Sequence, residues 1–384
     1  MSEEVLFLKM TPRDLLFCRD AKPMESSWTG KGGFLPGPAT FLGALTAEFC
    51  RKFPEELKLR YAQRKGNGLR SRGPFLCKGD ELYFPVPLDI APENKLLELG
   101  KLEGESDFPG FLEYALFAPQ ADKRSVAPYI SMSELKNYLE SRPFKTAEEG
   151  EFFDREARPG ITITPNTRTA EDGAFYYAEY LRLKPGVSLV GEAALNGENC
   201  LSRLFEGKER PLMPLGGQQT MVYVEAQQGK RLPRPQVRTS GTLVKWVLLT
   251  PAGFNQGWLP DFVEPETGRL LLTAETGERP ERLPGENRAA YRKRLVKVPI
   301  AAKLIAARIG KSIPVSGWKQ KGEGGGAPRA AHLCVPAGSV YYFRADDEKN
   351  AEMLVKTLTG KAYSVTSGRA GFGIGICGNF KISE

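Results

Sequence analysis

The sequence lacks the residues from which metal sites are usually built. It has one histidine, His332, and its six cysteines are scattered without a C-x-x-C pair or a neighbouring histidine. This pattern argues against a zinc site. Each cysteine has an apolar neighbour, which predicts small buried side chains in a reducing compartment rather than a disulfide framework. The triplet Asp346-Asp347-Glu348 points its carboxylates in different directions, so we interpret it as a solvated turn and expect no metal or other cofactor.

Long apolar runs are also missing. No run approaches the ~18 apolar residues that a membrane-spanning helix needs. The N-terminal stretch MSEEVLFLKM is acidic at the front and contains no long apolar core, so it does not resemble a signal peptide. We therefore expect a soluble, cytoplasmic protein.

Length and charge suggest two domains and a possible polyanionic partner. At 384 residues the chain is long enough for about two domains with separate cores. We place the boundary at the polar run Glu148-Glu149-Gly150-Glu151, which gives an N-terminal domain of residues 1–150 and a C-terminal domain of residues 151–384. The 54 basic and 46 acidic residues give a net charge of +8. This excess would suit a nucleic acid if it is concentrated on one surface.

The segment Leu15–Phe53 predicts a strand, a polar loop and a helix. Residues 15–17 are an apolar strand end, and Arg19 follows in a loop rich in glycine and proline. Residues 39–53 then place apolar side chains on one face of a helix, and Pro36 and Pro38 stand just before it, where a missing N–H costs little. This pattern opens an α+β domain whose arginine-bearing loop lies at the edge of a sheet.

A basic hairpin is predicted next. Five positive charges lie within 13 residues around the Gly66-Asn67-Gly68 turn, and two short strands joined at Gly79-Asp80 follow. The charged residues are Arg60, Arg64, Lys65, Arg70 and Arg72. A basic loop on a hairpin suits a phosphate backbone, and a solvated loop without a ligand is the open alternative.

Four other elements follow from local patterns. Residues 94–99 predict a weak helix, and residues 133–138 predict a second short helix. The run LVKWVLLT at residues 243–250 is strongly apolar and predicts a strand in the middle of a sheet. Residues 339–344 predict a further strand.

Residues 155–186 predict a hairpin that projects as a finger. Ile161 and Ile163 alternate in a strand that leads to a Pro165-Asn166-Thr167 turn, and residues 175–183 alternate in a second strand with aromatic side chains on both faces. The connection between them contains Arg168 and Thr169 among small and polar residues. Such a finger could clamp a nucleic-acid backbone or wedge beside a base. An ordinary hairpin with a long loop is the alternative.

The C-terminal half also contains exposed-loop patterns with aromatic residues or glycine. Trp258 and Trp318 could stack on unpaired bases or belong to the core, and Lys319 opens a basic, glycine-rich loop. Residues 368–378 contain five glycines, which would let the backbone approach a phosphate closely. They are not a dinucleotide-binding fingerprint, because no helix follows.

Taken together, these segments resemble the RAMP superfamily of CRISPR effector subunits, and in particular the Cmr-module subunit of type III-B effectors in the group that caps the crRNA 5′ handle. No single block carries the resemblance, but the blocks occur in order over nearly the whole chain. They are Phe17-Cys18-Arg19-Asp20 with Pro23, Pro36-Gly37-Pro38-Ala39-Thr40 with Gly43-Ala44-Leu45, Arg72-Gly73-Pro74-Phe75, Tyr83-Phe84-Pro85-Val86-Pro87, Arg168-Thr169-Ala170 with Gly173, Leu249-Thr250-Pro251-Ala252 with Gly257-Trp258-Leu259-Pro260, Ser316-Gly317-Trp318, Val335-Pro336-Ala337-Gly338-Ser339-Val340, and Gly371-Phe372-Gly373.

The resemblance implies an α+β fold of two ferredoxin-like (RRM-like) domains with inserted hairpins and loops. It also implies a non-catalytic, RNA-binding subunit that holds the repeat-derived 5′ handle of the crRNA in antiviral defence. Its partners would be the large polymerase-type effector subunit and the backbone RAMP subunits. By position, the handle would contact Arg19, Arg168, Thr169, Trp318, Gly371, Phe372, Gly373 and Gly375. From charge alone we add Lys22, Arg155, Arg158 and Lys319.

Two other functions remain open at this stage. Some RAMP relatives cut repeat RNA with a histidine general base, so His332 could serve a handle-processing endoribonuclease. A stand-alone RNA-binding protein would instead bind the handle tightly without partners, whereas a subunit of an assembly would bind weakly alone and co-purify with them.

Overall fold

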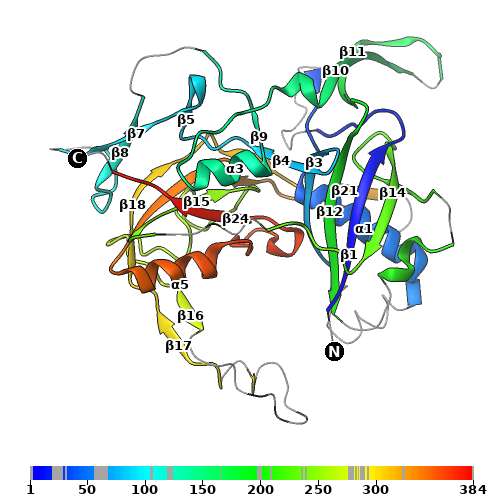
Figure 1. Cartoon of the computed structure of the whole chain (residues 1–384). Helices are drawn as coiled ribbons and strands as arrows, with labels where there is room; N and C mark the ends of the chain where they lie inside the picture. Colours follow the sequence, from blue (N-terminus) through cyan, green and yellow to red (C-terminus); the bar gives the residue numbers. More distant parts are fainter. Residues whose placement is uncertain are drawn as a thin grey trace.

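The structure is a computed structural model of a mixed α/β protein that consists mostly of strands (Figure 1). It describes residues 3–19, 29–30, 33–55, 68–103, 107–118, 124–164, 166–196, 201–207, 210–234, 240–275, 294–321 and 325–382, and the isolated positions 237, 281, 283, 285, 290 and 291. Within this part of the chain, no helix is both long enough and apolar enough to cross a bilayer.

The larger sheet has seven antiparallel strands. Their order is β13 (Leu212–Pro214), β14 (Met221–Gln228), β1 (Glu3–Pro12), β12 (Val187–Asn196), β3 (Arg70–Lys78), β4 (Glu81–Pro85) and β9 (Tyr129–Ser131). Helix α1 (Pro38–Lys52) packs on one face, where Phe41 and Leu45 share a core with Leu8 of β1. The predicted helix is therefore confirmed, and it begins at Pro38 with Gly37 as its N-cap. The predicted hairpin at Gly79-Asp80 is also confirmed, as β3 and β4.

The smaller sheet has four strands in the order β18 (Ala302–Arg308), β23 (Val340–Ala345), β15 (Leu243–Leu248) and β24 (Gly375–Asn379). The two strands predicted at residues 243–250 and 339–344 are confirmed, and β15 lies inside the sheet as expected. Helix α5 (Glu348–Leu358) packs on one face, with Leu354 in the same core as Trp246. Asp347 caps this helix by accepting a hydrogen bond from the Asn350 amide at 2.7 Å.

A third core joins the two sheets. Helix α3 (Met132–Leu139) lies between them in Figure 1, and it confirms the short helix predicted at residues 133–138. Its Tyr138 and the β4 residue Phe84 share a buried cluster with Val247 and Ile376 of the smaller sheet. The two sheets therefore meet through apolar side chains as well as through backbone hydrogen bonds such as Leu88 to Gly338 at 2.8 Å.

The remaining strands and turns lie outside the two large sheets. Strands β10 (Phe153–Ile163), β11 (Ala170–Leu183) and β2 (Thr29–Gly30) form a three-stranded sheet that projects at the top right of Figure 1. The short ribbons are β5 (Ile90–Ala91) with β6 (Lys95–Leu96), β7 (Glu98–Lys101) with β8 (Tyr114–Phe117), β16 (Thr273–Glu275) with β17 (Lys297–Pro299), β19 (Ile313–Val315) with β22 (His332–Cys334), and β20 (Trp318–Lys321) with β21 (Gly325–Pro328). Single 3-10 turns are η1 (Pro92–Asn94), η2 (Glu149–Glu151), η3 (Ser202–Phe205) and η4 (Gly368–Ala370).

The helix predicted at residues 94–99 is wrong. Glu93 and Asn94 adopt left-handed backbone angles, with φ of 63° and 57°, and this ends the 3-10 turn η1. Residues 95–101 then run extended through β6 and β7. An apolar pattern over only six residues cannot distinguish a helix from a strand. In the structure these residues belong to short two-stranded ribbons.

The predicted boundary at residue 150 does not separate the two large sheets. Strands β12, β13 and β14 lie after that residue and yet complete the larger sheet around β1, while the smaller sheet uses residues 243–379. The run that suggested a linker forms η2, in which Glu148 and Glu151 cap each other's backbone before β10. Polar composition there reflects a capped turn on the surface rather than a break between the sheets.

Candidate nucleic-acid interface

The predicted finger is present. Strands β10 and β11 pair from Phe153 opposite Leu183 to Ile163 opposite Ala170. The connection is closed by backbone hydrogen bonds from Thr164 to Thr169 (3.0 Å) and from Arg168 to Thr164 (2.9 Å). These bonds close the tip of the hairpin and hold Arg168 and Thr169 there.

The finger tip offers a cation, hydroxyls and apolar surface. Arg168 is exposed and has a left-handed φ of 54°, and the Thr169 hydroxyl lies 2.7 Å from that of Thr167. Ile161 and Ile163 are 49% and 56% exposed. Exposed aliphatic side chains can contact a base, and a neighbouring arginine can contact its phosphate.

At the finger base, the arginines are bound to carboxylates. Arg155 forms ion pairs with Glu149 (2.6 Å) and Glu179 (2.7 Å), and these bonds, with Glu149 first, raise its pKa above the ordinary value. Arg158 bonds Glu156 at 2.7 Å and lies over the ring of Tyr180. In any contact with RNA, Arg155 and Arg158 would therefore also remain bound to carboxylates of the protein itself.

The loop that carries Arg19 lies beside this base. The ring centroid of Phe17 is 5.0 Å from that of Tyr180 in β11, and Leu16 bridges Leu181. The Phe17 carbonyl also accepts a hydrogen bond from the Gly217 amide at 2.7 Å. Arg19 is exposed next to these anchors, so the structure places it near the base of the finger, and its contact with RNA stays a prediction. Lys22 lies outside the described residues.

The glycine-rich turn packs against the protein's own backbone. A Cβ on Gly371 would stand 2.8 Å from the Ser71 carbonyl oxygen, and one on Gly373 would collide with the Tyr363 carbonyl. At Gly375, an added Cβ would meet the indole of Trp246, and the Phe372 ring is itself buried. Internal packing alone therefore accounts for these glycines, and RNA contact at this turn stays a prediction.

The other predicted aromatic contacts divide into two cases. Trp318 and Lys319 lie on β20, which pairs with β21, and the structure describes their backbone only. Trp258 is half-buried and packs against the core of the smaller sheet, and its carbonyl accepts the Tyr341 hydroxyl at 2.6 Å. Trp258 therefore has a structural role.

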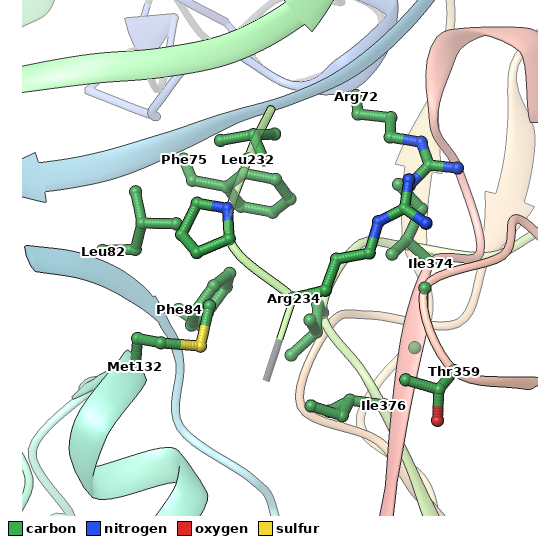
Figure 2. Close-up of a pocket in the computed structure, with 14 residues that line it drawn as sticks. Arg72, Phe75, Leu82, Phe84, Met132, Leu232, Arg234, Thr359, Ile374 and Ile376 are labelled. Atoms are coloured by element: carbon green, nitrogen blue, oxygen red, sulfur yellow. The ribbon is translucent and has the colours of Figure 1, made fainter. Parts of the chain in front are cut away.

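A pocket opens where the two sheets meet, beside the glycine-rich turn (Figure 2). Arg72 of β3 and Arg234, on the segment after β14, point toward one another in this view, across from Phe84 and Met132. The rest of the lining is almost entirely apolar. It consists of Phe75, Leu82, Leu232, Pro233, Leu249, Thr359, Gly360, Ile374, Gly375 and Ile376. Two cations therefore lie beside an apolar, partly aromatic floor.

Arg72 and Arg234 were not among the predicted handle contacts. Arg72 belongs to the predicted basic hairpin. The sequence shows its charge but not the direction in which its side chain points. Arg234 stands between Pro233 and Pro235 in a connecting segment with no motif around it. Gly375 is the one predicted contact that lines the pocket.

The sequence matches the CRISPR-associated Cas_Cmr3 family profile over residues 8–379. No curated protein sequence matches it. Among solved structures, a chain of the type III-B Cmr-beta complex bound to cognate target RNA aligns with a TM-score of 0.46 and 14% identity, over 96% of this chain and 95% of that chain. A chain of the Csm3–Csm4 subcomplex of the type III-A interference complex aligns with a TM-score of 0.38 and 12% identity, over 98% of this chain and 99% of that chain. Because the family match spans nearly the whole sequence, this protein belongs to the Cas_Cmr3 family of CRISPR-associated proteins, which confirms the resemblance to a type III-B Cmr subunit of the RAMP superfamily.

Proposed function

We propose that this protein is the subunit of a type III-B CRISPR effector complex that binds the 5′ handle of the crRNA. In this role it would lie between the large polymerase-type subunit and the backbone RAMP subunits in the cytoplasm, with each of its two large sheets as the core of a ferredoxin-like module. Membership of the Cas_Cmr3 family supports the effector role. The binding role rests on the pocket between the sheets.

The pocket carries the proposal because it combines the two kinds of contact that single-stranded RNA requires. The half-buried Phe75 would supply apolar surface for a base, and Arg72 and Arg234 would supply cations for the adjoining phosphate. Stacking of a base on an apolar or aromatic surface contributes ~1–3 kcal/mol. Phosphate contacts hold the strand in place without reading its sequence.

The same chemistry favours binding over cleavage. RNA cleavage by general acid–base catalysis requires a base and an acid within hydrogen-bond reach of the 2′-hydroxyl and the leaving oxygen. The pocket is lined by arginines, one threonine and apolar side chains, none of which is a good general base. His332 lies exposed on the separate ribbon β22. We therefore propose a subunit without catalytic activity of its own.

The test is to replace both arginines by alanine in the effector complex purified from its native host. The Arg72→Ala/Arg234→Ala variant should retain at least roughly tenfold less RNA, because each lost arginine–phosphate bond is worth ~1.5–3 kcal/mol. RNA would be quantified per complex and its 5′ ends sequenced. The matched control is Arg142→Ala/Arg269→Ala, which removes two exposed arginines that are bound to Glu140 and Asp346.

Two outcomes would separate the alternatives. Unchanged RNA content with intact 5′ ends would contradict the pocket as the binding site. Longer, unprocessed 5′ ends in a His332→Ala complex would favour the endoribonuclease. If Arg72→Ala disturbs folding, the single variant Arg234→Ala still tests the pocket, because Arg234 is exposed on a connecting segment.

A further inference from the structure

A buried carboxylate connects the two sheets. Asp89 follows β4 and is only 2% exposed. It accepts hydrogen bonds from the hydroxyl of Tyr138 in α3, at 2.7 Å to each oxygen, and from the hydroxyl of Tyr342 in β23, at 2.6 Å. Tyr138 belongs to the side of the larger sheet, and Tyr342 belongs to the smaller sheet. A single carboxylate therefore bridges the junction with bonds of the strong, charge-assisted kind.

Lys245 completes this cluster from β15. It is 1% exposed, and its Nζ lies 3.4 Å from the Tyr138 carbonyl and 3.4 Å from the centroid of the Tyr138 ring. The ammonium thus stands at the C-terminal end of α3, where the helix dipole favours a positive charge. Two independent contacts from the smaller sheet therefore end on Asp89 and Tyr138.

The cluster and the pocket share some of their secondary-structure elements. One pocket wall contains Met132, the first residue of α3, and Phe84 of the strand that leads to Asp89. The opposite wall contains Ile376 of β24, which pairs directly with β15. On one side the cluster therefore involves α3 and the segment after β4, which belong to one wall of the pocket, and on the other side it involves β23 and β15, the second of which pairs with β24 of the opposite wall.

We propose that Asp89 and Tyr342 are positioning residues that hold the two walls of the pocket at a fixed separation. Their hydrogen bond joins the segment after β4 to β23, so its loss loosens the junction between the two sheets without removing any group that lines the pocket. The consequence for RNA rests on the proposed function. The mechanical role of the cluster does not.

The chain offers a matched pair of variants on one strand. Tyr342→Phe removes the hydroxyl that crosses the junction, and Tyr341→Phe removes a hydroxyl that bonds the Trp258 carbonyl, also at 2.6 Å, inside the smaller sheet's own core. Both side chains are buried, and both variants lose one hydrogen bond. The bond lost in Tyr342→Phe crosses between the two sheets, whereas the bond lost in Tyr341→Phe lies within the core of the smaller sheet.

Hydrogen exchange of the purified full chain provides the first test. In Tyr342→Phe, amides of α3 and β24 should exchange on the order of tenfold faster than in the wild type, while those of α1 stay unchanged. In Tyr341→Phe, the acceleration should be confined to the loop around Trp258. Acceleration of α3 to the same extent in both variants, or in neither, would overturn the proposal.

RNA retention by the purified complex provides the second test. Tyr342→Phe should weaken RNA binding by roughly tenfold, and Tyr341→Phe should leave it unchanged. If the wild-type complex holds no RNA, the proposed function fails while the exchange result still decides the role of the cluster. If exchange responds as expected but RNA affinity does not, the cluster fixes the junction and the claim that it controls the pocket is wrong.

Discussion

Gly373→Ala is expected to lower the free energy of unfolding by about 3 kcal/mol or more, a loss typical of severe steric substitutions. Gly373 has a left-handed φ of 72°, which costs an alanine ~1–2 kcal/mol by itself. The added methyl group would also collide with the Tyr363 carbonyl. That carbonyl cannot easily move away, because the Tyr363 amide donates to the Gly373 carbonyl at 2.9 Å and the Gly373 amide donates to Pro251 at 2.7 Å.

Gly368→Ala is the matched control for this substitution. Gly368 lies in the same turn, but a Cβ there would meet no atom within 4 Å and its φ is not left-handed. Urea unfolding of the two variants measures the difference directly. Equal midpoints for Gly368→Ala and Gly373→Ala would show that the turn adapts to a side chain and would contradict the steric account.

The second large effect concerns the pH dependence of stability at Lys245. Burial lowers the pKa of Lys245 from 10.5 to about 8, and Asp89 acts in the opposite direction. Between these two values the unfolded chain binds more protons than the folded chain, so the contribution of Lys245 to stability increases with pH. Relative to Lys245→Met, the wild type should gain about 2 kcal/mol in unfolding free energy from pH 7.5 to pH 9.5.

Urea unfolding over this pH range would measure the gain. The range ends below pH 10 because the Tyr138 and Tyr342 hydroxyls, whose pKa values burial raises well above 10, oppose the gain at higher pH. Lys349→Met, at an exposed position of α5, is the matched control. A difference between the wild type and Lys245→Met that stays constant or falls with pH would show that the folded protein does not bury a charged lysine.

Elements with strong local signals could be predicted from the sequence. Helix α1 combines a proline start with one apolar face, and β15 is an unbroken apolar run, so neither depends on distant residues. The helix expected at residues 94–99 failed because its apolar pattern covers only six residues, and the left-handed backbone angles of Glu93 and Asn94 ended the turn. The domain boundary failed to coincide with the sheets because β12 to β14 return to β1 across a long separation.

The candidate site was harder to predict because it is made by residues far apart in the chain. The finger was visible, since its two strands and its turn are adjacent in sequence. The pocket brings together Arg72 and Arg234, and no local pattern states that these two arginines meet. The glycines at residues 371–375 gave a true signal of close approach, but the approaching groups identified in the structure are Ser71, Tyr363 and Trp246 of the protein.

The position of β24 also has a consequence for how the protein is made. This strand lies at the edge of its sheet next to β15, and it supplies Gly375 and Ile376 to the pocket. The facing wall, from β3 and β4, is translated about 300 residues earlier, and N-terminal parts of a chain generally fold first during synthesis. A growing chain on the ribosome therefore has no pocket. The pocket is completed in one late step, when β24 joins the sheet. Under the proposed function, RNA would therefore be loaded only after residues 375 and 376 have folded into place.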